Sequence, residues 1–531
     1  KHKVKQGQVV RLLGRVEEFN KLTEVKHVKA LAICKPAIQL PVPANITLPV
    51  SSLRQLEALE GMRVSVSQEL VVSDFYGTGY GLGNYGQFAV STQLHYQPTE
   101  RYTTKVLMNN PSVKDAKKHD YLLIDDGSYK RYPSFIPFPN KQGFSAKNPF
   151  RLRDKVSNVS GVLHAYKDNY IVIPDFVNSN LKVTSTPSDL HPIIDKRSNL
   201  VIASMNLGNY FNGSPNDESN SSAYSSKSSV DGFPTSRGAK SYKGFEMQTK
   251  KIVAALHKIN ADVIALMELE NDGYGRDSSI ATLTRALNSK LSKKDQYRYV
   301  IPKRKKLGYS AISVGLLYRN NKLSLSGEAK ILDARSSNNV FNDGLNRPSL
   351  LQEFKLKSHT SNQSAEPRVL VAVNHFKSKG KPCKNNETNS LQGHCNQTRV
   401  KAAKALVKFI AMHSRKTTDL PVIILGDLNS YSQEDPLLAL YKVGYTNIKK
   451  KDQFSYSYQG YVGNLDHALV NDALLPHVRS MSAWNINSVE DVLLDYHTEK
   501  TGHSYPSVDH YAEPDERRSS DHDPLVIGLE F

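Results

Sequence analysis

The chain has no long hydrophobic run. No stretch of its 531 residues approaches the roughly 18 consecutive apolar residues of a membrane span, which excludes an integral membrane protein. The first ten residues, KHKVKQGQVV, contain no apolar core of a signal peptide, so we expect any export signal to have been cut away or never to have been present. A hydrophobic content of 39% predicts a soluble globular protein, and the length predicts two or three domains.

The chain also has few cysteines, only three. Cys383 and Cys395 lie twelve residues apart around a polar loop that would profit from a crosslink, as in secreted proteins. The alternative is a pair of free thiols in a cytosolic protein, and composition does not separate the two. His394 beside Cys395 suggests zinc, but no second pair of Cys or His at metal spacing supports that interpretation. We expect Cys34 to be buried in a strand.

Acidic residues are in the minority. The 70 Lys and Arg residues exceed the 51 Asp and Glu residues, which gives a formal net charge of +19. Such a charge favours polyanionic partners, nucleic acid above all, although basic surfaces are often merely solvated.

Residues 1–100 read as short strands separated by Gly, Asn and Pro, which predicts a small all-β domain, and an OB-like barrel is our expectation. The aromatic residues of the glycine-rich segment 75–88 could stack on exposed bases or cap the barrel: Phe75, Tyr76, Tyr80, Tyr85 and Phe88. Residues 101–197 continue as strand-like and turn-rich segments, which predicts either a second small β unit or an extension of the first.

From residue 198 to 531 strand-like runs alternate with amphipathic helices, which predicts a layered α/β or α+β catalytic domain. Helices are expected at 246–260 and 398–412. Strands are expected at 200–204, 263–267, 314–319, 369–373, 422–425, 465–470 and 525–531. The Ser- and Gly-rich residues 212–243 predict a long surface loop.

Polar residues recur where these strands end. Asn206, Glu268 and His375 follow three of the strands closely, Asp427 and Asn429 follow a fourth, and the last two strands begin beside Asp466 and Asp521-His522. Each alone is more often a turn or helix-capping residue, but side chains at strand ends are where α/β scaffolds build sites. Their joint occurrence is far more specific.

In this order and spacing, the segments ASMNLGN, LMELEND, VNHFKSKG, ILGDLNSY, GNLDHALV and SSDHDPL resemble the motifs of the endonuclease/exonuclease/phosphatase family, whose founding members are similar to pancreatic deoxyribonuclease. Three further segments resemble a subgroup, the secreted bacterial nucleases of the ExeM/Xds type: GFPTSRGAKSYKGFEMQTKKIVAAL, LNRPSLLQEF and CNQTRVKAAKAL. In that subgroup an OB-like region precedes the nuclease domain.

The resemblance implies a four-layered α/β sandwich that hydrolyses phosphodiesters with a metal. It implies that Glu268 is the main magnesium ligand, with Asn206 and Asp521 nearby. It assigns Asp427 to the attacking water, Asn429 to a phosphate oxygen, and Asp466 to the fixing and charging of one imidazole, that of His522. His375 and His522 would flank the scissile phosphate, and Arg347 would contact it.

The chemistry of the residues agrees with these roles. Carboxylate and amide oxygens suit Mg²⁺, Mn²⁺ or Ca²⁺, with Mg²⁺ or Mn²⁺ as the expected cofactor and Ca²⁺ as a stimulating ion, whereas zinc would require His or Cys. Histidine can hold a phosphate or exchange a proton near neutrality. Gly208 stands where many repair-type relatives carry a carboxylate, so a second metal ligand is absent there, or Glu270 or Asn271 replaces it.

The basic residues of the chain indicate which of this family's substrate classes is expected. Lys377 and Lys379 lie close to His375, and the runs 303–306 and 449–451 are basic, which favours a long polyanion. We expect Lys377 to bind a phosphate of the substrate. No amphipathic aromatic helix points to a membrane, and no base-reading helix motif points to sequence specificity. We therefore expect a secreted, monomeric bacterial nuclease that cleaves extracellular DNA, with RNA as a further candidate. The alternatives are a phosphatase or phosphodiesterase of the same fold that acts on a small or lipid phosphate, and a non-catalytic DNA-binding protein.

Overall fold

The structure is a computed structural model that describes residues 4–36, 39–75, 81–175, 180–186, 191–213, 237–357, 366–383, 388–389, 391–414, 419–496 and 511–531. Its contacts divide the chain into two compact units. Unit 1 comprises residues 1–95, 112–186 and 459–461, and unit 2 comprises residues 96–111, 187–458 and 462–531. These bounds differ from the predicted division at residues 100 and 197, because residues 96–111 belong to unit 2.

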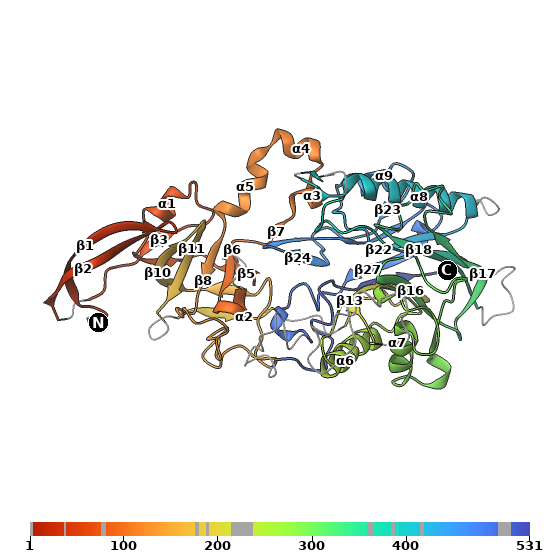
Figure 1. The fold of residues 1–531 in the computed structure, drawn as a ribbon, viewed down its shortest axis with the longest axis horizontal. Helices are drawn as coiled ribbons and strands as arrows, with labels where there is room; N and C mark the ends of the chain where they lie inside the picture. Colours follow the sequence, from red (N-terminus) through yellow and green to blue (C-terminus); the bar gives the residue numbers. More distant parts are fainter. Residues whose placement is uncertain are drawn as a thin grey trace. The chain divides into compact units, whose positions relative to one another are not determined.

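Unit 1 is built on one nine-stranded sheet, and strands from both sides of residue 100 pair in it (Figure 1). The order is β12 (Lys182–Thr184), β9 (Lys155–Ser157), β5 (Leu70–Asp74), β6 (Phe88–Ser91), β8 (Leu122–Ile124), β11 (Asn169–Pro174), β10 (Val159–Tyr166), β4 (Arg63–Val66) and β3 (Ala44–Ile46). Helices α1 (Arg54–Glu57) and α2 (Gly81–Tyr85) are short. The predicted all-β character of this region is confirmed, while its OB-like topology stays a prediction.

A long hairpin precedes this sheet. Strands β1 (Val9–Phe19) and β2 (Leu22–Lys35) pair only with each other, around a turn in which Asn20 and Lys21 have positive φ angles, as a type I′ turn requires. Cys34 lies in β2, so its placement in a strand is confirmed. Its predicted burial is wrong: the thiol is free and exposed, because the hairpin lies outside the sheet.

The aromatic residues of segment 75–88 that the structure describes belong mainly to the core. Phe75 and Phe88 are buried and pack edge-on against Phe150, with ring centroids 5.3 and 5.0 Å away. These two side chains therefore cannot stack on bases. Residues 76–80, with Tyr76 and Tyr80, lie outside the described residues.

Unit 2 contains two six-stranded sheets stacked between helices (Figure 1). The first sheet has the order β15 (Tyr297–Tyr299), β16 (Ile312–Arg319), β14 (Val263–Glu270), β13 (Leu200–Tyr210), β28 (Leu525–Leu529) and β27 (Val478–Ala483). The second has the order β17 (Leu323–Leu332), β18 (Arg347–Leu356), β19 (Arg368–His375), β22 (Val422–Asp427), β26 (Asp466–Val470) and β23 (Thr446–Asn447).

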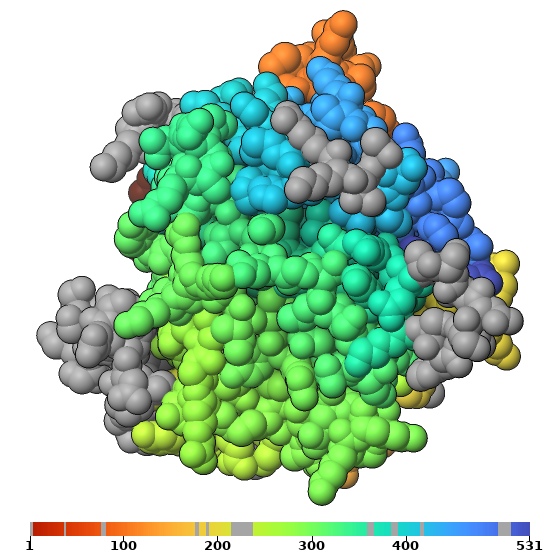
Figure 2. All heavy atoms as spheres, turned by 90° about the vertical axis from the view of Figure 1, so that its right-hand side faces the viewer, coloured from red at the N-terminus to blue at the C-terminus, as the bar shows by residue number. Residues whose placement is uncertain are grey.

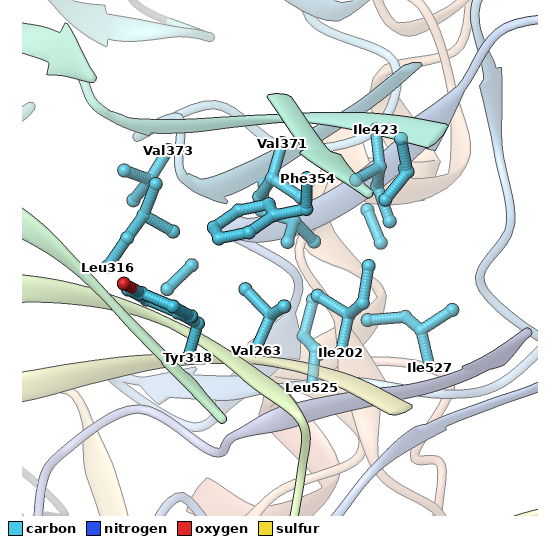
Figure 3. Close-up of a cluster of buried hydrophobic side chains, with 14 of the residues drawn as sticks. Ile202, Val263, Leu316, Tyr318, Phe354, Val371, Val373, Ile423, Leu525 and Ile527 are labelled. Atoms are coloured by element: carbon cyan, nitrogen blue, oxygen red, sulfur yellow. The ribbon is translucent and has the colours of Figure 1, made fainter. Parts of the chain in front are cut away.

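Three apolar clusters hold these layers together. The facing sides of the two sheets contribute Ile202, Val263, Phe354, Val371 and Ile423, which point toward one another in Figure 3. A second cluster joins the first sheet to helices α6 (Tyr242–Ile259) and α7 (Ser279–Asn288). A third joins the second sheet to α8 (Asn396–Ser414) and α9 (Asp435–Tyr441). The predicted four-layered α/β sandwich is thus confirmed.

Strand directions bring the predicted site residues to one edge. Strand β13 runs parallel to β14, and β19 runs parallel to β22, so the polar residues near their carboxyl ends face the same way. Strands β26 and β28 are antiparallel to their neighbours and therefore begin at that edge. The approach of β22 to β19 requires Gly426, since a Cβ atom there would lie 2.0 Å from the carbonyl oxygen of Asn374.

The sequence pattern predicted most elements of unit 2 and missed several. The predicted strands and both helices are present, but α7, β17 and β27 were not predicted. The predicted surface loop 212–243 falls largely outside the described residues, and α6 begins at Tyr242 within it. In the part of the chain that the structure describes, no helix is long and apolar enough to cross a membrane.

Candidate active site

Four predicted site residues meet where β13, β14, β19 and β22 end. Oε1 of Glu268 lies 3.8 Å from Nε2 of His375, and Oδ2 of Asp427 lies 3.4 Å from the same nitrogen. The side-chain amide of Asn206 donates a hydrogen bond of 3.4 Å to Oδ2 of Asp427. Glu268 has a φ of 62°, an uncommon value for a residue with a side chain, and such strain is concentrated at functional sites.

Asp466 and His522 form a second pair at the same edge. Oδ2 of Asp466 accepts hydrogen bonds from Nδ1 of His522, at 2.7 Å, and from the hydroxyl of Ser455, at 2.9 Å. The ring of Tyr456 packs against the imidazole, with centroids 4.6 Å apart. These contacts fix the orientation of the imidazole, whose Nε2 makes no hydrogen bond to the described part of the chain.

Neighbouring charges give the two buried histidines different charge states. At His375, burial and the nearby charge of Arg347 lower the pKa well below its usual value, so this imidazole is neutral. At His522 burial also opposes the charge, but the carboxylates of Asp466 and Asp521 outweigh it and raise the pKa well above the usual value. The site therefore has one neutral and one cationic imidazole at neutral pH.

The pKa values of two carboxylates at this edge are raised, which favours their neutral forms. Burial raises the pKa of Asp427 to about 7, with the cation of His522 as the main opposing influence. Burial and the negative charge of Asp521 raise the pKa of Glu268. An acid–base group with a pKa near the working pH is suited to proton transfer, and Asp427 has this property.

Asn429 and Arg347 are positioned through a shared backbone group. The side-chain amide of Asn429 and Nη1 of Arg347 both donate to the carbonyl oxygen of Phe376, at 3.2 and 2.8 Å. Nε of Arg347 is buried without a hydrogen-bond partner, and burial lowers the pKa of this guanidinium while Glu268 and Asp427 oppose that change. A buried cation with an unused donor is suited to hold an anionic ligand.

The two predicted lysines lie near enough to interact electrostatically with Arg347 and Asp427, but their ammonium groups are held by other parts of the chain. Nζ of Lys377 donates to the backbone carbonyls of Ser378 and Lys381, at 3.0 and 3.3 Å. Nζ of Lys379 is paired with the fully buried Glu434, so its charge is compensated. Three of the seven residues of the basic runs are also paired: Lys303, Arg304 and Lys449 each form an ion pair with a carboxylate.

The remaining candidate ligands divide into one exposed residue and two that support the structure. Asp521 is exposed beside His522, and its charge reaches Glu268. The side-chain amide of Asn271 donates to the backbone carbonyl of Leu307 and accepts from its backbone N–H. Glu270 accepts a hydrogen bond from the backbone N–H of Asn212, at 3.1 Å. Neither of the last two lies free to replace a carboxylate at position 208.

The predicted disulfide between Cys383 and Cys395 is confirmed. The segment that it closes is tied to the loop after His375 by the fully buried Arg399. The guanidinium of Arg399 donates to the carbonyl oxygens of Lys377 and Gln392, at 3.1 and 3.0 Å. The disulfide therefore braces the polypeptide that leaves the active site.

Sequence reasoning missed three residues near the cluster. The exposed Arg237 acts electrostatically on both Arg347 and His375. Tyr456 covers His522, and Tyr458, 57% exposed, lies nearly parallel to Tyr456 at a centroid distance of 6.5 Å. The alternation Tyr-Ser-Tyr before the GNLDH segment is a signal that could have indicated the two tyrosines, because residues i and i+2 of a strand share a face.

Glu100 was missed as well. Its carboxylate holds the loop that carries Asn429 and the loop that leads to Asp466. Its carboxylate is buried and accepts hydrogen bonds from the side chains of Ser432 and Asn464, at 2.8 and 2.9 Å, and from Nζ of Lys449, at 2.8 Å. Ser432 follows Asn429, and Asn464 precedes Asp466. Burial opposes the charge of Glu100, but Lys449 outweighs it and lowers the pKa.

Comparisons with known proteins find similarity in the part of the chain that contains this site. The profile of the Endonuclease/Exonuclease/phosphatase family matches residues 236–522, which is more than half of the chain. No curated protein matches. Similar solved structures include a mannosyl-6-phosphatase from Bacteroides thetaiotaomicron, with 14% identity, coverage of 62% of this chain and 100% of that chain, and a TM-score of 0.37.

Two further structures have the same level of similarity. The catalytic domain of human Nocturnin with bound sulfate is 13% identical, covers 64% of this chain and 97% of its own, and has a TM-score of 0.37. D. rerio TDP2 in complex with a single-strand DNA product is 12% identical, covers 62% and 99%, and has a TM-score of 0.34.

Replacing Glu100 with glutamine should destabilise unit 2. The variant Glu100→Gln leaves the ammonium of Lys449 without its counter-charge, and breaking a buried ion pair costs about 3–5 kcal/mol. Since the folded-state pKa of Glu100 is lowered, its charge contributes stability above the ordinary value of 4.5 and loses it as the pH falls further. Chemical denaturation at a series of pH values should show a difference from wild type at pH 7 that shrinks below pH 4.5.

The matched control is Glu366→Ala, at an exposed glutamate of the same unit, which should leave stability nearly unchanged. Equal stability of Glu100→Gln and wild type at pH 7 would contradict a supporting role for Glu100.

Proposed function

Because the chain belongs to the endonuclease/exonuclease/phosphatase family, we propose that it is a secreted bacterial nuclease that hydrolyses the phosphodiester bonds of extracellular DNA with a divalent metal. The observation that carries this proposal is the meeting of buried carboxylates, a neutral His375 and a cationic His522 at one sheet edge. The disulfide supports an oxidising compartment, where such bonds persist.

The donor set at this edge fits a hard divalent cation. Glu268, Asn206 and Asp521 offer carboxylate and amide oxygens, although in the described ranges no three His, Cys, Asp or Glu side chains are grouped so that they could hold a metal ion by themselves. Mg²⁺ is commonly held in this open manner, by one or two carboxylates together with water and substrate phosphate. A bound dication would also relieve the repulsion between Asp521 and Glu268. When bound, it would supply positive charge to the phosphoryl oxygens.

The side chains then divide the hydrolysis among them. Arg347 and the amide of Asn429 hold phosphoryl oxygens, and the neutral His375 donates a hydrogen bond from Nε2 without adding charge. Asp427 takes a proton from the attacking water as the water oxygen bonds to phosphorus. The bond from phosphorus to the leaving oxygen breaks, and the cationic His522, held by Asp466, gives that oxygen a proton.

Two observations favour a nucleic acid over a small phosphate ester. The net charge of +19 attracts polyanions from solution. From His522 outward, Tyr456 and the exposed Tyr458 form an aromatic path that leads away from the reacting groups. Aromatic side chains beside a phosphodiester site can stack on the neighbouring base, which a simple phosphate ester lacks.

Cleavage of covalently closed circular plasmid tests the proposed reaction. Wild-type protein should nick the circle with Mg²⁺ and leave it intact with EDTA. The variant Glu268→Gln should lower the nicking rate by about 10³-fold, because it removes a carboxylate on which the divalent cation depends, and should keep the melting temperature of the wild type.

The control is Glu246→Gln, at an exposed position of α6, which should nick at the wild-type rate. Cleavage of a linear duplex alone would indicate exonucleolytic action by the same chemistry. Failure on both forms, together with phosphate release from a small ester, would establish the phosphatase alternative, and wild-type nicking by Glu268→Gln would refute the site.

Stacking on Tyr458 is testable with an oligonucleotide that has one cleavable phosphodiester among methylphosphonate linkages. Base–aromatic stacking is worth about 1–3 kcal/mol, so Tyr458→Ala should raise KM about 5- to 150-fold at unchanged kcat. Tyr458→Phe, which keeps the ring, should behave as wild type. An abasic residue beside the cleavable bond should remove the difference between Tyr458→Ala and wild type; persistence of the difference on both the 5′ and 3′ abasic substrates would exclude base stacking.

A further inference from the structure

A cavity of about 720 Å³ lies in unit 2 away from the residues assigned to catalysis. It is lined by α7, by β15 at the edge of the first sheet, by Tyr318 of β16 and by Leu325 of β17 at the edge of the second sheet. These elements belong to the green part of the chain that fills the centre of Figure 2. The loop that joins β14 to α7 supplies Arg276, so this loop connects the cavity to the strand that carries Glu268.

The cavity has a positive charge that its own lining does not compensate. Three exposed arginines contribute to the lining, Arg276, Arg285 and Arg298, and no Asp or Glu does. The side chains of Arg276 and Arg298 form no ion pair or hydrogen bond within the described ranges. Arg285 donates to the carbonyl oxygen of Arg276 and to the hydroxyl of Thr282, neither of which carries a charge.

Three other cations of this part of the chain are neutralised by carboxylates. Lys303 pairs with Glu328, Arg304 pairs with Asp333, and Lys322 pairs with Asp262 at 2.9 Å. The three lining arginines differ from these three cations, because no carboxylate pairs with them in the described residues. A cluster of unpaired guanidinium groups is suited to bind phosphate, whose oxygens match their fork of donors.

Most of the neutral polar groups of the lining are already hydrogen-bonded within the structure. The hydroxyls of Tyr297, Tyr299 and Thr284 donate to the backbone carbonyls of Ala261, Tyr274 and Ile280. The side chain of Asn288 exchanges two hydrogen bonds with the backbone of Tyr297, at 2.7 and 2.9 Å. Guanidinium groups are therefore the main free donors, so an anionic ligand fits the cavity better than a neutral one.

We propose that this cavity is a second phosphate-binding site, which holds the backbone of the nucleic acid substrate at a distance from the bond that is cleaved. The assignment rests on the proposed function, because a polymer with repeated phosphates can reach both the sheet edge at Glu268 and the arginines of the β14–α7 loop and β15. We expect a short oligonucleotide bound at the sheet edge to leave the arginines of the cavity without a phosphate partner. The site thus confers a preference for long substrates.

The test is equilibrium binding of labelled DNA in EDTA, where nothing is cleaved, with a 60-base-pair and an 8-base-pair duplex over a salt series. The variant combines Arg276→Gln and Arg298→Gln, two exposed positions whose side chains hold no other part of the structure. Each lost phosphate contact should weaken binding of the long duplex about tenfold at 0.1 M salt and make the salt slope shallower by about 0.9. Binding of the short duplex should be unchanged.

The control variant combines Lys401→Gln and Lys404→Gln, which removes the same charge from the exposed side of α8. It should leave the salt slope for the long duplex as in wild type, and Arg276→Lys with Arg298→Lys should restore most of the binding. An unchanged slope in the arginine variant, an equal loss in the control, or an equal loss on the short duplex would each overturn the second site. Because binding is measured without catalysis, a failure of the proposed nuclease activity would appear separately, as absence of cleavage by the wild type with Mg²⁺.

Discussion

Crowding of like charges at one sheet edge is the constraint on which the rest of the site depends. Glu268, Asp427 and Asp466 approach one another there, and burial raises the pKa of the first two. A buried carboxylate that keeps its charge needs a cation close by. The imidazolium of His522 and the guanidinium of Arg347 supply some of this positive charge. We propose that a divalent cation supplies the rest beside Glu268 and Asp521.

Both histidines are buried, which by itself lowers their pKa values, and the neighbouring charges explain why the two differ. His375 lies among cations as well as carboxylates, since Arg347, Arg237 and His522 all disfavour its protonation. His522 has its own carboxylate partner at 2.7 Å and keeps its proton. One edge of the sandwich therefore offers a proton acceptor, a proton donor and a neutral hydrogen-bond donor within a few side chains of one another. The proposed hydrolysis uses all three.

Support for this edge comes from regions distant in sequence. Glu100 accepts hydrogen bonds from Ser432 and Asn464, and these two residues follow and precede segments of the second sheet that carry candidate site residues. Arg399 and the disulfide hold the chain that leaves His375. Loops that carry reacting groups need such backing, because a small displacement of a catalytic group lowers the rate steeply. Residues 96–111 are accordingly part of unit 2 and not a linker to it.

The sequence was sufficient for the sandwich and for the gathering of the main site residues, because strands with buried runs and polar ends place those ends at one edge. It was insufficient where tertiary pairing decides a residue's use. From the sequence, Lys379 is a cation close to His375 that could contact a phosphate. Glu434 neutralises its charge, and no local sequence pattern indicates that ion pair. Glu100 has no neighbouring motif at all, and the exposure of Cys34 follows from a hairpin that no other described strand pairs with.

Anomalous diffraction from crystals soaked in Mn²⁺ tests the central claim most directly, because it locates the cation independently of catalysis. The account predicts one strong peak within ligand distance of the carboxylate of Glu268, beside Asn206 or Asp521, and the loss of that peak in Glu268→Gln. A fully occupied Mn²⁺ elsewhere in a protein that still cleaves DNA, or the same peak in Glu268→Gln, would contradict it.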